Sequence, residues 1–575
     1  MKKNKLGLIT LSLLSLSLIA CGNNTDTSKP ATDSNTPNVT DTAKPDTDPS
    51  TTEGSSYATI PEEDMTGGLV MTLDDTRSYF IVTDYISVEY DIVIPDVYQG
   101  LPVREIGEAA FRYKTIDSIT LPHSLRKIGK EAFLGLSYDS QIKELDLPEG
   151  LEEIDDQAFC YCPTITTVTL PSTLKKLGSG VFHLCANIKK VKTAKGSEHF
   201  LAENNVLYSN DKKTLYFYPA GLNFTSYDLP EEVEHISDYA FYGNQVLTAI
   251  GIPSNCNLTS IGYRAMAAIT NLTTLRLEKA EKLTEVGDLA ISENSSLIKV
   301  TLPKSLSKLS RGLLYKDGAL QSVTIQGDYT EIPDDFLSNC NKLQSFTIPN
   351  GVTKIGASAF YSCGNLTKID LPATVSEIGE NAFSACFSLK SFTFPAAVTE
   401  VPTKMFTSCR ALTTVTLHDG ITSIGDNAFE GCSTLTGIDL SMTKITELKE
   451  NTFMSCGAMT EAKLPETLTV IKDSAFKFCY ELRRIQIPSH VTTIGDDAFF
   501  NCSKLTYVYL PKSVKSIGTV AFRTVYASEG KVNLYFEADS FVNENTEVGN
   551  NFTNGNIFYG KTLSDYETDS QGALL

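Results

Sequence analysis

Residues 363–386 read C-G-N-L-T-K-I-D-L-P-A-T-V-S-E-I-G-E-N-A-F-S-A-C, and this order of apolar, proline, glycine and cysteine positions returns on both sides of the stretch. Most of the cysteines recur 23 residues apart, with one step longer by a single residue, at Cys340, Cys363, Cys386, Cys409, Cys432, Cys456, Cys479 and Cys502. An apolar residue, usually followed by proline, recurs with them at Ile348, Leu371, Phe394, Leu417, Leu440, Leu464, Ile487 and Leu510. Self-similarity at a period of about 20–29 residues predicts a solenoid, in which each repeat stacks on the next.

Each repeat contains one short apolar stretch that suits a strand. Leu366, Ile369 and Leu371 fit a strand that points its apolar residues inward. Lys368 and Asp370 alternate with them and therefore point outward. One repeat cannot bury its own apolar face, so the strands have to stack in parallel.

The rest of the repeat returns the chain to the start of the next strand. Pro372 cannot donate a ladder hydrogen bond and ends the strand. Gly379 allows either a positive φ or close packing between coils. Ala382, Phe383 and Cys386 suit a single helical turn, because positions three apart share a face, and Phe383 then fills the space behind the strand.

The pattern I-G-x-x-A-F-x-x-C-x-x-L-x-x-I-x-L-P resembles the BspA-like leucine-rich repeats of bacterial surface proteins. It matches at Ile355-Gly356, Ala359-Phe360, Cys363 and Leu366 to Pro372, and the resemblance covers roughly residues 94–522. It implies an α/β repeat solenoid, a right-handed coil of short parallel strands and short helical turns with a repeat of ~23 residues. It also implies adhesion to a host matrix protein, a host cell or another bacterium.

The N-terminus predicts export and a lipid anchor. Residues 1–20 have a lysine-rich start and a short apolar run, which is typical of a signal peptide and too short for a membrane span. Leu18-Ile19-Ala20-Cys21 resembles the lipobox of bacterial lipoproteins, which implies lipidation of Cys21. An ordinary secretory signal with an incidental cysteine is the alternative. Residues 21–57 are rich in Thr, Ser, Asp and Pro and predict a disordered tether.

The remaining boundaries follow from changes in the pattern. Residues 58–92 contain two alternating segments around Asp74-Asp75-Thr76-Arg77, which predict a β-hairpin that caps the solenoid. The repeats occupy residues 93–525, with a hairpin insertion at about 196–222 that is either a projection or a variant coil. Residues 526–575 are expected to form a C-terminal cap and a polar tail.

The thirteen cysteines do not predict a disulfide framework. Eight of them share one repeat position, where other copies place Lys114, Leu136, Asn244, Ile269, Asn294, Asp317 and Val525. A position that accepts Cys, Asn or Asp favours a small group that bonds to the local backbone over a disulfide partner. We therefore expect free, buried thiols rather than disulfides. Cys160-Tyr161-Cys162 has no second close pair and does not predict a metal site.

No catalytic pattern was found. The six histidines belong to no nucleophile or metal motif, and paired carboxylates such as Asp155-Asp156 lie beside turns. The formal net charge of −20 and the lack of a basic stripe disfavour nucleic acid as a partner. We expect no enzyme activity, no cofactor and a monomer.

The outward strand positions form the surface best suited to binding. They are rich in Ser and Thr along much of the stack, which strand propensity alone can explain. Towards the C-terminus the face changes, and Tyr and Arg are enriched at the centres of interfaces. The candidate ligand-binding residues are Lys463, Arg484, Gln486, Tyr507 and Tyr509.

Together these features predict a cell-surface protein, anchored in the bacterial membrane by lipid on Cys21, that binds an extracellular macromolecule. Protein adhesion is the first hypothesis. The alternative is a scaffold that binds surface polysaccharide or envelope components, with Tyr507 and Tyr509 stacking on sugar rings.

Overall fold

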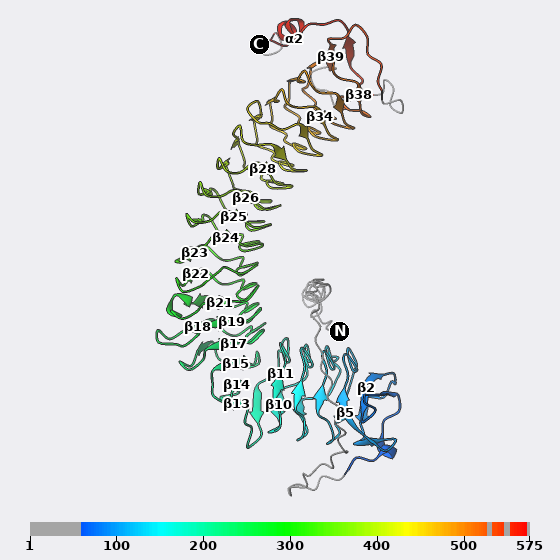
Figure 1. Cartoon of the computed structure of the whole chain (residues 1–575), viewed down its shortest axis with the longest axis vertical. Coiled ribbons are helices and arrows are strands. Elements are labelled where there is room, and N and C mark those ends of the chain that lie inside the picture. The colour runs from blue at the N-terminus through cyan, green and yellow to red at the C-terminus, as the bar shows by residue number, and fades with distance from the viewer. Residues whose placement is uncertain (1–58, 526–531, 545–551, 572–575) are drawn as a thin grey trace, which may run out of the picture. The chain divides into compact units, whose positions relative to one another are not determined.

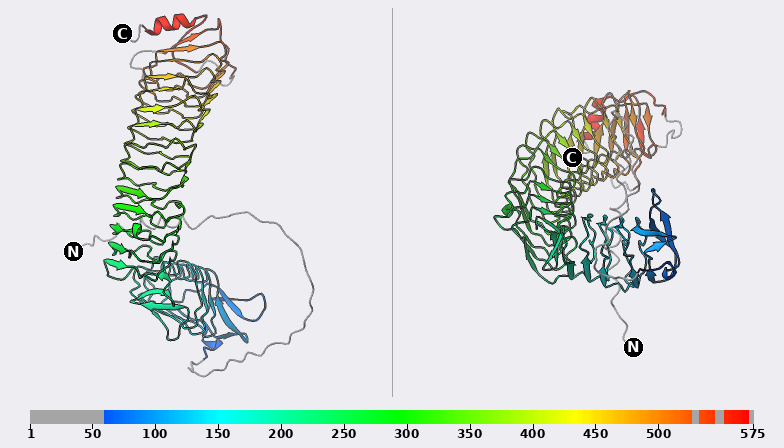
Figure 2. Two further views of the ribbon diagram at one scale, coloured as in Figure 1. Left: turned by 60° about the vertical axis from the view of Figure 1, so that its left-hand side comes forward. Right: turned by 60° about the horizontal axis from the view of Figure 1, so that its bottom comes forward.

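The computed structural model describes residues 59–525, 532–544 and 552–571. The predicted signal peptide, the lipidation site Cys21 and the tether 21–57 lie outside the described residues, so these remain predictions. The described residues form a solenoid of about 20 turns in which short parallel strands lie side by side in consecutive coils (Figures 1 and 2). The predicted parallel-strand solenoid is therefore confirmed, and it contains almost no helix.

Two rows of strands run along the stack. The short-strand row comprises β7 (Lys127–Ile128), β9 (Glu153–Ile154), β11 (Lys176–Leu177), β17 (His235–Ile236), β19 (Ser260–Ile261), β21 (Glu285–Val286), β24 (Glu331–Ile332), β25 (Lys354–Ile355), β26 (Glu377–Ile378), β28 (Glu400–Val401), β30 (Ser423–Ile424), β32 (Glu447–Leu448), β34 (Val470–Ile471), β36 (Thr493–Ile494) and β38 (Ser516–Ile517).

The long-strand row comprises β3 (Asp91–Val93), β6 (Ser118–Thr120), β8 (Glu144–Asp146), β10 (Thr167–Leu170), β12 (Lys190–Thr193), β16 (Ser226–Asp228), β18 (Ala249–Gly251), β20 (Thr274–Leu275), β22 (Lys299–Leu302), β23 (Ser322–Ile325), β27 (Ser391–Thr393), β29 (Thr414–Thr416), β31 (Gly437–Asp439), β33 (Glu461–Lys463), β35 (Arg484–Gln486), β37 (Tyr507–Leu510), β39 (Asn533–Phe536) and β40 (Asn556–Phe558). Short 3-10 helices lie at η2 (Glu62–Asp64) and η3 (Leu277–Lys279).

The two ends of the described chain differ from the coils. At the N-terminal end β1 (Leu69–Leu73) pairs antiparallel with β2 (Phe80–Tyr85), and β2 continues in parallel into β5 (Leu101–Ile106), which also pairs with β4 (Val97–Tyr98). The hairpin is therefore present where the alternating segments predicted it. At the other end β39 and β40 extend the long-strand row, and α2 (Leu563–Gln571) follows them.

The expected helical turn is not present in the coil. In its place the chain makes consecutive turns in which Asn381 and Ala385 adopt left-handed conformations, with φ of 56° and 57°. The N–H groups of Asn381, Phe383 and Ala385 then donate to the next coil, at distances of 3.1, 3.2 and 2.8 Å, to the carbonyls of Thr403, Met405 and Thr407. A helical turn would keep these N–H groups within its own coil. Apolar residues three positions apart share a face both in a helical turn and in these consecutive turns, so the sequence pattern did not distinguish the two conformations.

These three hydrogen bonds recur between consecutive coils, and we call them the turn ladder. Each left-handed non-glycine residue costs roughly 1–2 kcal/mol. The ladder satisfies N–H groups that burial would otherwise leave unpaired, which offsets that cost.

Where glycine precedes the turn, it allows two neighbouring backbones to pack closely. A Cβ atom on Gly379 would lie 2.4 Å from the backbone N of Ala357 in the previous coil. One on Gly356 would lie 2.4 Å from the N of Asp334. Glycine at this position therefore serves the close approach of neighbouring backbones and is not needed for a positive φ.

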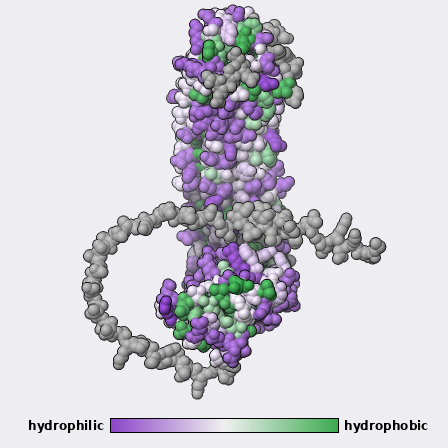
Figure 3. Space-filling view, turned by 90° about the vertical axis from the view of Figure 1, so that its right-hand side faces the viewer, coloured by the Kyte–Doolittle hydropathy of each residue, from purple (hydrophilic) through white to green (hydrophobic). Residues whose placement is uncertain are grey.

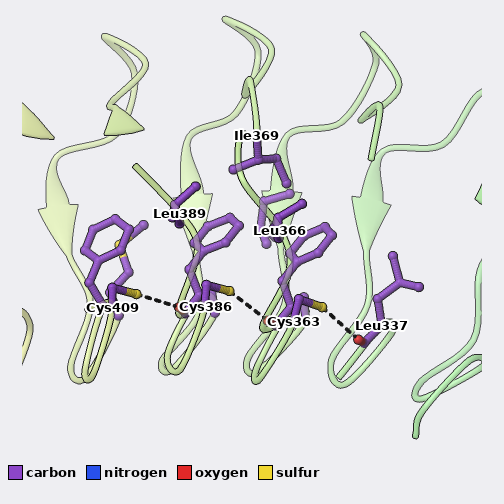
Figure 4. Packing of buried hydrophobic residues seen from close by; sticks show 14 of the residues in the cluster. Leu337, Cys363, Leu366, Ile369, Cys386, Leu389 and Cys409 are labelled. Atoms are coloured by element: carbon purple, nitrogen blue, oxygen red, sulfur yellow. Dashed lines mark hydrogen bonds between the residues drawn. The ribbon is translucent and has the colours of Figure 1, made fainter. Parts of the chain in front are cut away.

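The cysteine column is buried, as predicted, and its thiols bond to the backbone of the preceding coil (Figure 4). The Sγ atoms of Cys363, Cys386 and Cys409 donate to carbonyl oxygens 3.1–3.2 Å away, those of Leu337, Phe360 and Phe383. The twelve cysteines in the described part of the chain are all buried, and none of them forms a disulfide there. Asn294 uses the same position in the same way, since its amide donates to Met266 O at 3.0 Å and accepts from Ile269 N at 2.8 Å.

Three antiparallel strands interrupt the coils at the predicted insertion. They are β13 (Phe200–Glu203), β14 (Val206–Ser209) and β15 (Thr214–Phe217), and β15 pairs in parallel with β17. The sequence predicted β14 and β15 but not β13. Side chains from the two faces of β14 join different cores: Val206 and Tyr208 belong to the core that runs to Phe552, while Leu207 belongs to the core that begins at Phe80.

Candidate macromolecule-binding face

The outward side of the long-strand row presents aligned polar columns. Parallel pairing places Ser391 beside Thr414 and Thr393 beside Thr416, so equivalent repeat positions lie next to each other along the stack. Eight of these outward side chains between residues 322 and 416 are exposed hydroxyls, namely Ser322, Thr324, Ser345, Thr347, Ser391, Thr393, Thr414 and Thr416. We call this set the hydroxyl face.

The hydroxyl face differs from other exposed hydroxyls of the coil. Thr413, which precedes β29, donates from Oγ1 to the carbonyl of Lys390 at 3.1 Å, and Thr353 donates to Thr330 O at 3.2 Å. Among the residues that the structure describes, the eight side chains of the hydroxyl face make no hydrogen bond to the protein. Their donors and acceptors are therefore free for a ligand, a distinction that strand propensity could not reveal.

A shallow groove of about 230 Å³ lies on the same side of the coils. It is bounded by the segment that contains Lys368 and Asp370 and by β27, with Ser391 and Thr393 in its lining. Lys368 Nζ and Asp370 carboxylate lie 2.8 Å apart and are both largely exposed. An exposed pair of this kind adds little to stability but supplies one charge of each sign to a partner.

The structure corrects one premise of the predicted C-terminal patch. Tyr509 is only 7% exposed, because it packs in a cluster with Tyr535 and with Tyr566 of α2. The Tyr509 and Tyr566 ring centres are 5.9 Å apart. Figure 2 shows α2 lying across the end of the long-strand row. The sequence alone gave no sign that this helix covers the face.

The other four residues of that patch have different surroundings. Lys463 is exposed and its Nζ lies 3.2 Å from Asp439, on the neighbouring strand. Gln486 is exposed, whereas Arg484 and Tyr507 are half-buried. The register places Arg484 beside Tyr507 and Gln486 beside Tyr509, so the members of the patch on β35 and β37 lie together as expected. Binding by this patch stays a prediction.

Burial by α2 also changes the acidity of the tyrosines. Burial, and then the nearby Glu537 carboxylate, raises the pKa of Tyr509. Burial raises the pKa of Tyr566 to about 12, although the positive charge of Arg484 opposes this shift. Both phenols therefore stay neutral at physiological pH, and neither is available to a ligand as an exposed ring.

The structure brings together one thiol–imidazole pair that the sequence motifs did not identify. Cys160 Sγ lies 3.3 Å from His183 Nε2, because the two residues hold the same repeat position in neighbouring coils. His183 Nδ1 donates to the carbonyl of Gly180 at 2.8 Å, so Nε2 is left as an acceptor for the thiol. Burial lowers the pKa of His183 to about 4, and the ring stacks on Tyr239 at 4.4 Å. The contact is that of a neutral buried pair rather than an activated nucleophile.

The described ranges hold neither a metal-ligand cluster nor a helix suited to crossing a membrane. No group of three or more His, Cys, Asp or Glu side chains there is arranged to hold a metal ion. None of the helices in those ranges combines the length and apolar character that crossing a bilayer requires. The visible surface in Figure 3 is largely hydrophilic along the upper coils.

Comparison with known proteins agrees with the repeat pattern. The model of the BspA type leucine rich repeat region matches this chain in overlapping segments at 104–217, 213–343, 330–456 and 399–529. No curated protein matches the chain.

Solved structures of bacterial repeat proteins are similar to the chain. A leucine-rich repeat protein from Bacteroides ovatus is 18% identical, with 86% of this chain and 99% of that protein covered and a TM-score of 0.50. A leucine-rich repeat protein from Eubacterium ventriosum is 18% identical, with 64% and 94% covered and a TM-score of 0.41. A leucine rich cell surface protein from Faecalibacterium prausnitzii is 19% identical, with 89% and 97% covered and a TM-score of 0.30. At these identities the likeness concerns the fold, and the family assignment rests on the repeat model: the chain belongs to the BspA-type leucine-rich repeat family.

Proposed function

We propose that this protein is a lipid-anchored adhesin of the bacterial cell surface, which binds an extracellular protein through the hydroxyl face. A leucine-rich repeat scaffold is suited to protein–protein interaction, because stacked coils present a long surface without a deep active-site cavity. The observation that carries the proposal is the set of eight exposed hydroxyls between Ser322 and Thr416 that have no hydrogen-bond partner among the described residues, with Ser391 paired beside Thr414 and Thr393 beside Thr416.

The chemistry of this face fits an extended polar partner. Hydroxyls can donate and accept, so they tolerate partners of varied sequence. The formal charge of −20 opposes anionic partners elsewhere on the molecule, while the Lys368–Asp370 pair keeps this face locally neutral. The tether and the lipid on Cys21, both inferred from the sequence, would hold the solenoid away from the membrane with this face accessible.

The proposal is tested with the soluble fragment 59–575, which forms one compact unit. It is applied to an array of extracellular matrix proteins and glycans, together with a variant that carries Thr393→Arg and Thr416→Arg. The two long side chains should block close approach to the hydroxyl face and abolish saturable binding to a protein.

The matched control carries Thr399→Arg and Thr422→Arg, two exposed threonines beside the short-strand row. It should bind like the unchanged fragment. Equal binding by both variants would contradict the role of the hydroxyl face. Binding to glycans alone would favour the polysaccharide scaffold, which the burial of Tyr509 otherwise weakens.

A third variant tests the C-terminal patch separately. Arg484→Ala combined with Gln486→Ala removes two of its polar side chains without disturbing Tyr509. If the patch contributes, affinity falls at least tenfold while the thermal unfolding midpoint is unchanged. No change in affinity would leave the hydroxyl face as the binding surface.

A further inference from the structure

Within the described coils the turn ladder has one interruption, where the inserted strands separate two coils. The coil at residues 157–161 donates normally: the N–H groups of Gln157, Phe159 and Tyr161 bond to the carbonyls of Ser179, Val181 and His183, at 2.9–3.0 Å. In the described part of the chain, the equivalent N–H groups of the next coil, those of Gly180, Phe182 and Leu184, have no partner. The insertion therefore leaves one coil with an open donor edge.

The facing carbonyls show why the edge stays open. Those of Asp238 and Tyr242 accept no hydrogen bond from the described residues, and that of Ala240 accepts from Tyr218 N at 2.8 Å. The N–H of Tyr218 thus bonds to the carbonyl that the N–H of Phe182 would reach in a continuous turn ladder. Side chains still hold the two coils together, since Ser179 Oγ donates to Asp238 Oδ2 at 3.1 Å.

The short-strand row is interrupted at the same point. Elsewhere the glycine N–H that follows a short strand donates to the strand of the preceding coil, as Gly178 does to Ile154 O at 2.8 Å. After β17 the corresponding donor, Ser237 N, bonds to Leu215 O of the inserted strand β15. The carbonyl of Leu177 at the edge of β11 therefore accepts nothing from the described residues.

A cavity of about 340 Å³ lies against this edge. Its lining includes Leu177, Gly180 and Phe182 from the open coil, and Asp238 and His235 from the facing coil. This volume lies near the lower end of the range for ligand pockets. No lysine or arginine lines it, so an anionic ligand would find a carboxylate and no compensating cation.

The rest of the stack shows what these backbone groups bind. In neighbouring coils the same N–H groups take a peptide carbonyl, and the same carbonyl takes a peptide N–H. We propose that the open edge of Leu177, Gly180 and Phe182 binds a short extended polypeptide segment of a partner protein, backbone to backbone. This is β-strand addition at an unpaired edge. It goes beyond binding at the hydroxyl face and does not depend on it.

The packing of the coils predicts part of the partner's sequence. Where this position is glycine, an added Cβ atom would meet the backbone of the preceding coil; on Gly178 it would lie 2.4 Å from Asp156 N. In this chain Asp155 stacks on Gly129 and Lys449 stacks on Gly425, so a segment that stacks on Gly178 can carry glycine or a larger residue there, after an apolar residue. Asp238 favours a neutral or basic segment over an acidic one.

The test uses a blocked hexapeptide, acetyl-Lys-Ile-Gly-Ala-Ser-Ala-amide, which copies residues 354–359 of this chain. Amide hydrogen exchange of fragment 59–575 is followed by mass spectrometry. Without peptide, residues 180–184 should exchange at least tenfold faster than the paired residues 157–161. Millimolar peptide should slow exchange at 180–184 at least fivefold and leave 157–161 unchanged.

Two matched comparisons make the result specific. The same peptide with N-methylated backbone amides should protect at least tenfold less well, because it cannot donate to the carbonyl of Leu177. His235→Trp, which fills the cavity mouth, should abolish protection, whereas Ser423→Trp at the equivalent position of β30 should retain it. Equal starting exchange in the two segments would overturn the proposal. So would absence of protection, indifference to N-methylation, or protection by maltotriose in place of the peptide.

Discussion

The Sγ of Cys386 donates to the carbonyl oxygen of Phe360, 3.2 Å away in the preceding coil. Because the phenylalanine rings of these two coils also stack, with Phe360 and Phe383 5.3 Å apart, thiol and ring together join consecutive coils. The buried thiols thus connect consecutive coils by hydrogen bonds and do not form disulfides with each other.

Cys386→Ala should lower stability by about 1–3 kcal/mol, since it removes the thiol bond and leaves a small cavity. The measurement is the urea midpoint of fragment 59–575. Cys256→Ala is the matched control, because Cys256 is buried but its thiol has no hydrogen bond to the described residues. A larger loss for Cys256→Ala would contradict the role assigned to the thiol bond.

The buried thiols should make the protein less stable in alkali. Burial raises the pKa of Cys363, Cys409 and Cys502 to about 12, above the ordinary value near 8.5. The folded state therefore holds these protons more tightly, so stability present below about pH 8.5 is lost as the pH rises towards 12.

Urea unfolding of fragment 59–575 between pH 8 and pH 12 measures this loss, and stability that does not fall over that range would contradict it. Thiol titration tests the burial of the thiols separately. In fragment 59–575 at pH 8 no thiol should react with Ellman's reagent, and all twelve should react after unfolding without reductant. Fewer than twelve reactive thiols in the unfolded fragment would show that disulfides form, and rapid reaction of the folded fragment would contradict burial.

Asp317→Asn should stabilise the protein at neutral pH. Asp317 is fully buried at the cysteine position, its Oδ1 accepts Asn294 N at 2.7 Å, and its Oδ2 has no partner among the described residues. Burial raises its pKa well above 3.8. The folded state therefore retains a proton that the unfolded state releases, and stability falls as the pH rises above about 4.

The asparagine variant should gain about 1–3 kcal/mol at pH 7 and lose much of the pH dependence between 4 and 7. Urea unfolding at a series of pH values tests this. Asp419→Asn, at an exposed position, should change neither quantity. If Asp317→Asn were less stable than the parent, the unpaired Oδ2 of Asp317 would not be the main energetic cost at this position.

Ala385→Gly should stabilise the protein by up to ~1 kcal/mol, because Ala385 is left-handed with a φ of 57°. Ala382→Gly, three residues earlier, should destabilise it, because that alanine is buried and does not have a positive φ. Thermal unfolding of both variants distinguishes this turn from the helical turn, in which both glycines would be harmful.

Tyr566→Ala should uncover Tyr509. Without the ring of α2, Tyr509 becomes accessible and its pKa falls towards 10. Nitration followed by peptide mapping should label Tyr509 in the variant and spare it in the parent. Labelling of Tyr509 in the parent would contradict its burial.

The sequence predicted the stack because stacking imposes a strict period. An apolar residue one step out of register would point outward, so the positions of Leu366, Phe383 and Cys386 together define the coil. The hairpin at residues 69–85 and the insertion near 200–217 were also predicted, from local alternation of apolar residues.

Only the tertiary structure decided three features, and each depends on contacts between segments far apart in sequence. Asn381 and Ala385 adopt left-handed conformations because the N–H groups of this turn bond to carbonyls in the next coil, which no property of the turn itself specifies. Tyr509 is covered because α2 returns across the strands. The open edge at Gly180 exists because the inserted strand β15 takes the pairing position beside β17. The repeat pattern predicts which backbone and side-chain groups of a coil must contact the next coil. Only the folded chain shows whether the next coil supplies their partners.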